Sequence, residues 1–282
     1  MRTVALFGNP LRRLHSVVMH NAAFAAFDID ARYELRELQE PELADQVRQA
    51  RNEKWLGFQI TAPYKQAIMS LLDEVEPAAR RIGAVNSVEI GEDGRLIGFN
   101  TDVIGFMTAV RNCAHADLTG ARVVVAGSGG VGHAATYGLA EAGVERLTVL
   151  DLDAADARRL ATEFSAFTQI EPMAFDDPRT GDRLGEADLF VNATSVGMLT
   201  PGPVVDVARI SPEAAVFDVV YVPSQTELVR QARARGMRAA GGADMLVAQA
   251  AAAFVRWTGT EDPTTLMREA VEPLLHCADL TP

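Results

Sequence analysis

A glycine-rich loop between two short apolar strands constrains the fold more than any other part of the sequence. Residues 121–153 read ARVVVAGSGGVGHAATYGLAEAGVERLTVLDLD. They predict a strand, the loop 127–132, a helix, and a second strand that ends at Asp151. This order of strand, G-x-G-x-x-G loop, helix, strand and acid predicts a complete βαβ unit of an α/β protein.

The same loop predicts a dinucleotide site of the Rossmann type. Glycines allow the backbone to approach a pyrophosphate, and unpaired N–H groups at the start of the next helix favour its negative charge. We therefore expect the loop to bind the cofactor through Gly127, Ser128, Gly129, Gly130 and Val131. The strand before the loop and the acid after it favour this interpretation over a tight turn that binds nothing.

Asp151 bears on which dinucleotide is bound. A carboxylate at the end of the second strand can accept hydrogen bonds from ribose hydroxyls, whereas a 2′-phosphate there would meet a like charge. The stretch DLD (151–153) supplies two acids and no arginine, so it favours NAD over NADP. The alternative is a surface aspartate in a loop, with Arg158 or Arg159 folding back to the site.

The chain before this unit predicts a second α/β layer. Apolar runs and turn signals alternate between strand and helix, and Asp93-Gly94 favours a tight hairpin. The expected strands are 3–8, 31–38 and 57–61, and the expected helices are 15–29, 40–53 and 65–75. After the glycine loop we expect strands at 187–194 and 215–221, a helix at 225–236 and an apolar terminal helix from 243.

Composition limits the classes of protein that remain. A chain of 282 residues with 48% hydrophobic residues fits two ordinary domains. The net charge of −12, without basic clusters, argues against a nucleic-acid partner. No apolar run predicts a signal peptide or a membrane span, so we expect a cytoplasmic protein. Cys113 and Cys277 lie far apart and His15 and His20 are five apart, so we expect packing cysteines and no metal site.

Short motifs along the chain occur in the order and spacing of one family. The chain resembles the shikimate dehydrogenase family, including its quinate/shikimate members, from near residue 5 to near residue 257. The motifs are FGNP with HSVVMHN, ITAPYK, GAVNSV, GFNTDVIGF, AGSGGVG, NATSVGM, FDVVY and MLVAQAAAAF. Their order is far more specific than any single motif, and composition alone would not have shown it.

The resemblance implies reversible hydride transfer between NAD and a ring hydroxyl of shikimate, quinate or a related cyclic polyol carboxylate. It implies a substrate domain (1–105, with the terminal helix 243–282 packing back on it), a Rossmann domain (106–242) and an active site in the cleft between them. It assigns catalysis to Lys65 and Asp102. It implies substrate contacts for Ser16, Gln59, Thr61, Asn86, Tyr221 and Gln249, and further cofactor contacts for Asn192, Ala193 and Thr194. The family contains monomers and homodimers.

The chemistry explains why a lysine and an aspartate would serve together. Oxidation of an alcohol requires the O–H proton to leave as hydride leaves carbon, and the reverse reaction requires a proton donor. A lysine free in water keeps its proton near neutrality, so we expect Lys65 and Asp102 to act as a coupled pair. Taken alone, Lys65 fits a solvated lysine at a helix start and Asp102 fits a helix cap, and only the motif order favours catalysis.

Several positions depart from the family pattern. The family carries Ser-x-Ser where this chain has Leu14-His15-Ser16, so one carboxylate-binding hydroxyl is missing. A hydrogen bond to a charged group is worth ~1.5–3 kcal/mol, so the loss should weaken carboxylate binding by roughly one to two orders of magnitude. Arg12, Arg13 or His15 are candidate replacements. Gln59 stands for the usual Asn and lengthens the side chain by one methylene, and Val222 for another Asn.

Asp244 stands where the family usually has glycine, and we expect it to cap the last helix, with an electrostatic effect on the oxidised nicotinamide as the alternative. The function that we expect is an NAD-preferring, shikimate dehydrogenase-like enzyme whose best substrate differs from shikimate. The alternative is a catalytically silent NAD-binding sensor of the same fold, against which the intact Lys65 and Asp102 argue.

Overall fold

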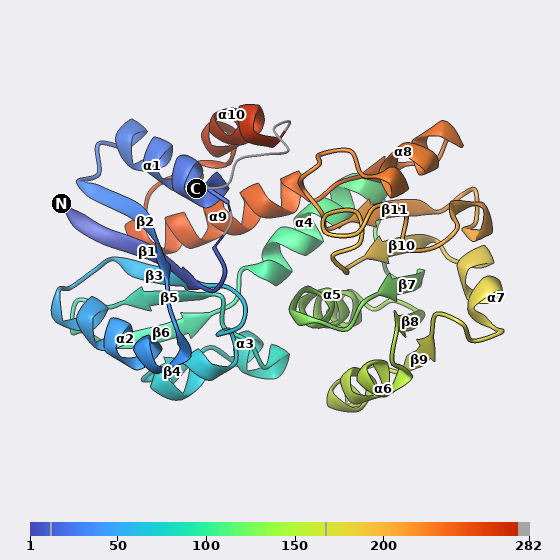
Figure 1. Ribbon diagram of the computed structural model, residues 1–282, viewed down its shortest axis with the longest axis horizontal. Helices are drawn as coiled ribbons and strands as arrows, with labels where there is room; N and C mark the ends of the chain where they lie inside the picture. Colours follow the sequence, from blue (N-terminus) through green and yellow to red (C-terminus); the bar gives the residue numbers. More distant parts are fainter. Residues whose placement is uncertain (12, 167, 276–282) are drawn as a thin grey trace. The chain divides into compact units, whose positions relative to one another are not determined.

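The computed structural model describes residues 1–11, 13–166 and 168–275 (Figure 1). They form two compact units, each with its own sheet. Unit 1 comprises Met1–Ile104 and the chain from Val247 onward, and unit 2 comprises Gly105–Leu246. Cys277 and Arg12 lie outside the described residues. No helix among the described residues is long and apolar enough to cross a membrane.

Unit 1 is built on a mixed sheet with the strand order β2-β1-β3-β5-β6-β4. β1 pairs in parallel with β2 and β3, and β5 runs antiparallel to both β3 and β6. The predicted hairpin at Asp93-Gly94 is confirmed as the β5–β6 connection, but β4 rather than the hairpin forms the edge of the sheet. The strands are β1 (Arg2–Gly8), β2 (Ala31–Glu37), β3 (Gly57–Ile60), β4 (Glu74–Val75), β5 (Ser87–Ile90) and β6 (Leu96–Phe99).

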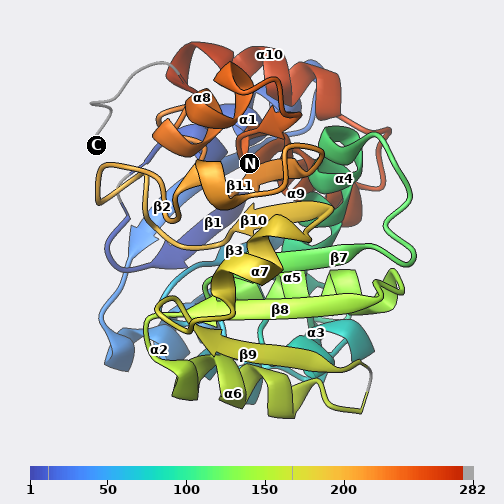
Figure 2. The same ribbon diagram turned by 90° about the vertical axis from the view of Figure 1, so that its right-hand side faces the viewer.

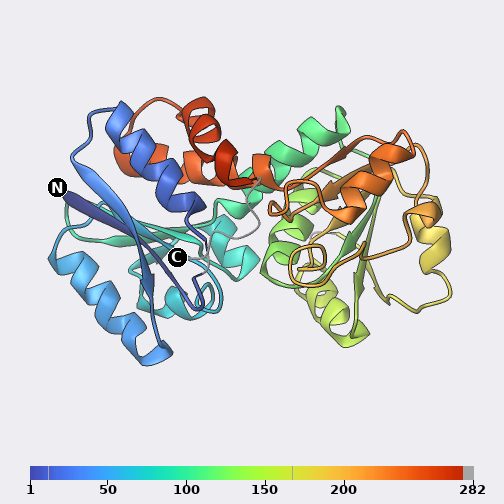
Figure 3. The ribbon, with the colours of Figure 1, turned by 45° about the horizontal axis from the view of Figure 1, so that its top comes forward.

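Helices cover both faces of this sheet (Figure 1). On one face lie α1 (His15–Ala26), the terminal helix α9 (Ala243–Thr258) and α10 (Thr264–Leu275), and Figure 3 shows α10, dark red, beside the blue α1. Phe254 of α9 packs on Phe24 of α1, with 5.1 Å between ring centroids. On the other face, α2 (Leu43–Asn52) contributes Leu43 and Val47 to a core with Phe7 and Phe58. The shorter elements are η1 (Glu40–Glu42), η2 (Ala67–Leu71) and α3 (Pro77–Ile82).

Two predicted helices of this unit are wrong in extent. The segment expected to be helical over 65–75 contains only the 3-10 turn η2, followed by the strand β4. Asp73 explains the change, because its carboxylate accepts a hydrogen bond from the Leu96 N–H and its own N–H donates to the Leu96 carbonyl, which draws the chain toward β6. The terminal region expected as one helix is two helices, since Gly259 has a φ of +67° and Pro263 precedes α10.

Unit 2 is a parallel sheet with the order β12-β11-β10-β7-β8-β9, flanked by helices (Figure 2). This order is the doubly wound arrangement of the Rossmann fold, so the predicted α/β class is confirmed. The strands are β7 (Arg122–Ala126), β8 (Arg146–Asp151), β9 (Ile170–Ala174), β10 (Leu189–Asn192), β11 (Ala215–Asp218) and β12 (Ala239–Ala240). The helices are α4 (Asp102–Ala114), whose first three residues belong to unit 1, α5 (Gly130–Glu141), α6 (Ala154–Glu163), α7 (Thr180–Gly185), η3 (Val207–Arg209) and α8 (Glu227–Ala234).

Candidate active site

Lys65 and Asp102 form an ion pair within unit 1. The Lys65 Nζ donates to the Asp102 Oδ2 at 2.7 Å. The side chain of Asp102 is 5% exposed and that of Lys65 is 20% exposed, so solvent reaches the amine and hardly reaches the carboxylate. Asp102 is the first residue of α4, where the helix dipole favours a negative charge. A charged pair with an open ammonium side can exchange a proton with a bound hydroxyl.

Asn86 holds the second oxygen of this carboxylate. Its Nδ2 donates to the Asp102 Oδ1 at 3.0 Å and to the Thr101 Oγ1 at 3.0 Å. Its Oδ1 accepts from the Thr101 N–H at 2.8 Å, so the amide is engaged on both sides. The structure therefore brings three of the expected site residues, Lys65, Asn86 and Asp102, into one hydrogen-bonded cluster.

The backbone that carries Lys65 is tied to the strands around it. The Thr61 N–H donates to the Phe7 carbonyl at 2.8 Å, which continues the pairing of β1 and β3, and the Val85 N–H donates to the Lys65 carbonyl at 2.8 Å. The Tyr64 hydroxyl is buried among core residues. Thr61 and Lys65 thus lie on a turn whose two ends are fixed by backbone hydrogen bonds.

The side chain of Gln59 is buried and forms its hydrogen bonds with other residues of unit 1. It is 7% exposed, its Oε1 accepts from the Tyr33 hydroxyl at 2.6 Å, and its Nε2 lies 3.5 Å from the Ser87 Oγ. Tyr33 is fully buried, and the ring of His20 stacks on it at 4.4 Å. Burial raises the pKa of Tyr33 well above its usual range, against the effect of a hydrogen bond with the Ser16 side chain. Burial also lowers the pKa of His20 to about 3.

The start of α1 carries the departure from the family pattern. Leu14 occupies the N-cap position and makes no side-chain cap hydrogen bond. His15 is 1% exposed, and burial, followed by the charge of Arg13, lowers its pKa, so at neutral pH His15 supplies no positive charge here. Ser16 and Arg13 are the half-buried polar side chains that remain at this end of the helix among the described residues.

The two remaining expected substrate residues lie in different units. Gln249 is a half-buried residue of α9 in unit 1, whereas Tyr221 is half-buried in the loop that follows β11 in unit 2. Asp244, expected as the cap of α9, is instead its second residue, because the helix begins at Ala243. Its carboxylate therefore lies in the first turn, where it favours the helix through the dipole and not as the N-cap.

The glycine loop of unit 2 has room for a pyrophosphate. α5 begins at Gly130, and its N-cap Gly129 offers no side-chain cap, which leaves the first N–H groups of the helix for a ligand. A Cβ added at Gly129 or Gly130 would meet no atom within 4 Å, so the space above these residues is open. Gly127 has a φ of +100°, and a Cβ on Gly132 would lie 2.2 Å from the Gly127 carbonyl oxygen, so both need glycine. These residues fit a dinucleotide.

Asp151 joins this loop to the end of β8. Its Oδ2 accepts from the Ser128 N–H at 2.8 Å and from the Ser128 Oγ at 2.6 Å, while its Oδ1 accepts from the Leu152 N–H at 2.7 Å. The half-buried carboxylate thus lies at the predicted place beside the loop. The guanidinium of Arg159 pairs with Asp156 on its own helix, one turn away, and Arg158 is exposed.

Asn192, Ala193 and Thr194 follow β10 in the same unit. The Asn192 side chain is buried and holds the loop from within: its Oδ1 accepts from the Thr194 Oγ1 at 2.6 Å and its Nδ2 donates to the Val196 carbonyl at 3.0 Å. Sequence reasoning missed three buried polar residues, which are Tyr33 and His20, stacked on each other in unit 1, and Asp218, which ends β11 in unit 2. The aspartate of FDVVY was the one sequence signal for any of them, because an acid is unusual at the end of a buried strand.

A doubly wound sheet with an open glycine cradle, in a chain that also carries a lysine–aspartate pair, defines a nicotinamide-dinucleotide-dependent oxidoreductase. Two family models agree with this class. Residues 6–88 match the shikimate dehydrogenase substrate binding domain, and residues 242–272 match the shikimate 5'-dehydrogenase C-terminal domain. With these matches and the relatives described next, the chain belongs to the shikimate dehydrogenase family.

Relatives in this family are named for different cofactors. The chain is 35% identical over 271 residues to a shikimate dehydrogenase (NADP(+)) of Bacillus cereus, covering 94% of this chain and 96% of the relative. It is 44% identical over 221 residues to a quinate/shikimate dehydrogenase (NAD(+)) of Corynebacterium efficiens, covering 78% of each. The solved quinate dehydrogenase of Corynebacterium glutamicum in complex with NAD matches with a TM-score of 0.88 and 35% identity, over 96% of this chain and 99% of that chain.

Proposed function

We propose that this protein oxidises a ring hydroxyl of quinate, shikimate or a related cyclic polyol carboxylate, with NAD as the preferred acceptor. The observation that carries the proposal is the Lys65–Asp102 pair, 2.7 Å apart, with Asn86 on its second carboxylate oxygen. NAD, when bound, accepts the hydride from the substrate carbon. The residues of the chain bind the ring, orient its hydroxyl and take up its proton.

In the proposed mechanism Lys65 in its unprotonated form accepts a hydrogen bond from the substrate hydroxyl, and its amine takes the hydroxyl proton and becomes the ammonium as the C–H bond breaks. The Asp102 carboxylate stabilises the ammonium that forms on Lys65. Asn86 donates to the other oxygen of this carboxylate and so holds it in the orientation that faces Lys65. In the reverse reaction the ammonium returns the proton to the developing alkoxide. We assign Thr61, Asn86, Gln249 and, from unit 2, Tyr221 to the ring hydroxyls, and Ser16 to the acid end.

The preference for the substrate follows from the start of α1. Leu14 replaces a hydroxyl and His15 is neutral, so the acid end keeps the Ser16 hydroxyl and the positive charge of Arg13. This arrangement recognises a carboxylate more weakly than two hydroxyls would, and it supports a substrate other than shikimate. The proposed preference for NAD rests on Asp151, whose carboxylate ends β8 beside the glycine loop, because a 2′-phosphate bound near it would meet a like charge.

We also propose that the two compact units correspond to a substrate domain and a cofactor domain, close to the divisions 1–105 with 243–282, and 106–242. The described catalytic pair lies in unit 1, and the glycine cradle lies in unit 2. Each unit thus carries one of the two functions that the reaction needs.

Initial rates with quinate, shikimate and an uncharged ring polyol, each with NAD and with NADP, test this function. We expect the ring acids to be oxidised faster with NAD than with NADP. A strong preference for NADPH-driven reduction would contradict the proposal, and turnover of the uncharged polyol alone would move the substrate class away from acids.

Lysine variants supply the matched control, because the sequence contains two lysines, Lys54 and Lys65. Lys65→Ala should reduce turnover by about 10²–10⁴-fold, the usual contribution of a positioned acid–base group, while NAD still binds. Lys54→Ala should leave turnover unchanged, because Lys54 is exposed and lies outside the cluster. Retained NAD binding without turnover of any ring acid in the wild type would instead support a sensor.

A further inference from the structure

Asp218 is a buried carboxylate that the proposed reaction does not use. It ends β11, and it is 0% exposed. It accepts hydrogen bonds from the Thr226 hydroxyl at 2.6 Å, the Asn192 Nδ2 at 2.9 Å and the Val220 N–H at 3.0 Å. All three of these groups are neutral. Burial raises the pKa of Asp218 to about 6, against the effect of these hydrogen bonds.

The Asn192 side-chain amide connects Asp218 to the loop after β10 through hydrogen bonds. Its second N–H donates to the Val196 carbonyl at 3.0 Å, and its oxygen accepts from the Thr194 N–H at 3.0 Å and the Thr194 hydroxyl at 2.6 Å. The Thr194 hydroxyl in turn accepts from the Val196 N–H at 3.1 Å. Both N–H bonds of the Asn192 amide are therefore used to shape this loop and to reach Asp218.

The other two contacts hold the loop after β11 at both ends. Val220 N–H fixes its beginning, and Thr226 is the N-cap of α8, where its hydroxyl oxygen accepts from the Val229 N–H. Tyr221 lies between these two points. One carboxylate thus connects the chain after β10, the chain after β11 and the first turn of α8.

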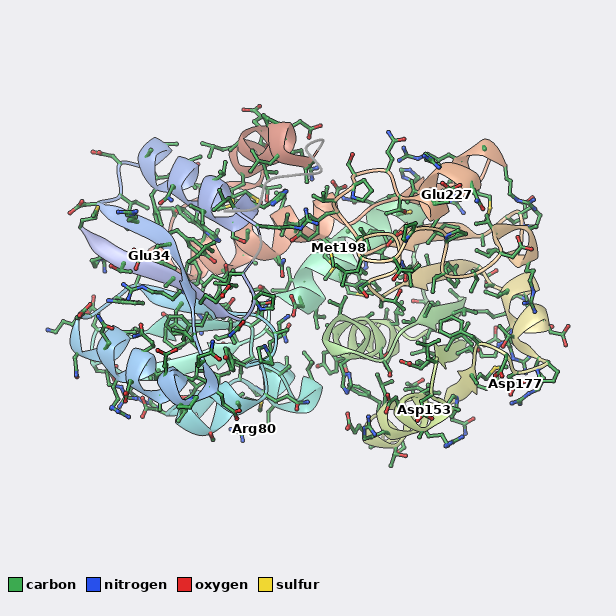
Figure 4. The ribbon with its side chains drawn as sticks, viewed as in Figure 1. Glu34, Arg80, Asp153, Asp177, Met198 and Glu227 are labelled. Carbon is green, nitrogen blue, oxygen red and sulfur yellow. The ribbon has the colours of Figure 1, made fainter. Side chains whose placement is uncertain are left out.

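Gly197, in the loop after β10, lies close to the side chains of Asp218 and Thr226. Its φ is +97°, and a Cβ there would be 3.2 Å from the Thr226 Cγ2 and 3.8 Å from the Asp218 Oδ2. Figure 4 labels Met198, which follows Gly197, and Glu227, which follows Thr226. The loop after β10 therefore packs directly against Thr226 and Asp218, the donor and the acceptor of the buried hydrogen bond.

We propose that Asp218 is a positioning residue that holds loop 193–200 and loop 219–226 in the shape required for the cofactor to bind. This inference rests on the proposed function, because it takes these loops to be part of the cofactor site. A buried charge adds little to stability compared with a well-packed apolar side chain, and removal of its partners is costly. Its effect is thus to fix two loops relative to one another, and Asn192 acts through this contact.

Variants of the two ends of the contact test the proposal. Asp218→Asn keeps the shape and removes the charge, and Thr226→Val keeps the shape and removes the hydroxyl. Each should raise the Kd and KM for NAD about tenfold, as expected for one lost hydrogen bond to a charged group. Thr226→Ser retains the hydroxyl and should stay within about twofold of wild type. Thr226→Val also removes the cap of α8, so the double variant should bind NAD no more weakly than Thr226→Val alone, because Asp218→Asn then has no further contact with Thr226 to remove.

Two further readouts separate positioning from general stability. Amide hydrogen exchange should rise in 193–200 and 219–226 and stay unchanged in α5 and β8. NAD affinity of the wild type should fall as pH drops through about 6, because protonated Asp218 gains an O–H that faces the donating Thr226 hydroxyl, and Asp218→Asn should lack this dependence. The control is Asp206→Asn, since Asp206 is an exposed helix-capping aspartate of the same unit.

The outcomes distinguish this inference from the function beneath it. Wild-type protein that binds neither NAD nor NADP overturns both. Wild-type binding with unchanged NAD affinity in Asp218→Asn and Thr226→Val overturns the positioning role alone. Exchange that rises equally across the whole of unit 2 also overturns it, because the carboxylate would then support the unit and not the loops.

Discussion

Gln59 illustrates at the scale of a single residue how a side chain's position changes its role. Its place in the motif predicted a substrate contact, and that assignment stays a prediction. Its amide oxygen accepts from the buried Tyr33 hydroxyl, and a hydrogen bond joins Tyr33 to Ser16. Gln59 is thus connected through Tyr33 to Ser16, the residue that we propose for the acid end of the substrate.

Tyr33→Phe tests this contact. The change leaves the buried Gln59 oxygen without its donor, so the free energy of unfolding should fall by about 1–3 kcal/mol. Tyr33→Phe combined with Gln59→Leu removes both partners and should recover much of that loss. Urea denaturation of the two variants measures the difference. A double variant less stable than the single one would show that Gln59 does not depend on Tyr33.

At the scale of elements, the glycine loop separates folding from binding. Gly132 is required by the fold, because its Cβ would lie 2.2 Å from a backbone oxygen, whereas Gly130 has open space around it. Two glycines of one loop, Gly130 and Gly132, are thus present for different physical reasons. The sequence analysis expected Gly130 to contact the cofactor and gave Gly132 no contact of its own, and the structure shows that Gly132 is needed for packing.

We expect Gly130→Ala to fold as well as the wild type, or better by up to ~1 kcal/mol, because alanine favours the helix. Its methyl group would occupy the space of the pyrophosphate, so NAD affinity should fall at least about tenfold, a loss of roughly 1.4 kcal/mol. Gly132→Ala, the matched change, should instead lower the melting temperature. Calorimetry with and without NAD measures both quantities. Equal NAD affinity in Gly130→Ala and wild type would mean that the cofactor lies elsewhere.

The buried carboxylate of Asp218, between β11 and α8, predicts that the stability of the fold depends on pH. The pKa of Asp218 is raised from 3.8 to about 6, so the folded chain keeps a proton through a range in which the unfolded chain has lost it. Stability therefore falls as pH rises through this range, by up to about 3 kcal/mol, and is level above it. Urea denaturation from pH 4 to pH 7 measures this effect. The free energy of unfolding of the wild type, relative to that of Asp218→Asn, should decrease as the pH rises through this range. A constant difference would contradict the burial of this charge.

At the scale of the whole molecule, each unit has a core of its own. Phe254 of α9 is fully buried against Phe24 and His20 in unit 1, and Phe164 is fully buried against Tyr137 in unit 2. Both tryptophans, Trp55 and Trp257, also belong to unit 1. Tryptophan fluorescence therefore reports on unit 1, and NAD binding, which we propose for the glycine loop, would report on unit 2.

Phe254→Ala should lower the urea midpoint of tryptophan fluorescence, since loss of a buried phenylalanine costs about 3–5 kcal/mol, and should leave the midpoint of NAD binding in place. Phe164→Ala should do the reverse. If both probes shift together in both variants, the two units unfold as one.

The sequence by itself determined the α/β class, the βαβ unit at the glycine loop, the β5–β6 hairpin and the family, because these depend on local periodicity, on glycine and on motif order. It could not determine that 65–75 is mostly not helix, since hydrogen bonds between Asp73 and Leu96 override the local pattern. Only the tertiary structure decided that Asn86 joins Lys65 and Asp102, that Gln59 meets Tyr33 and that Asp218 joins two loops. These contacts link residues distant in sequence, and only the packed fold sets their distances.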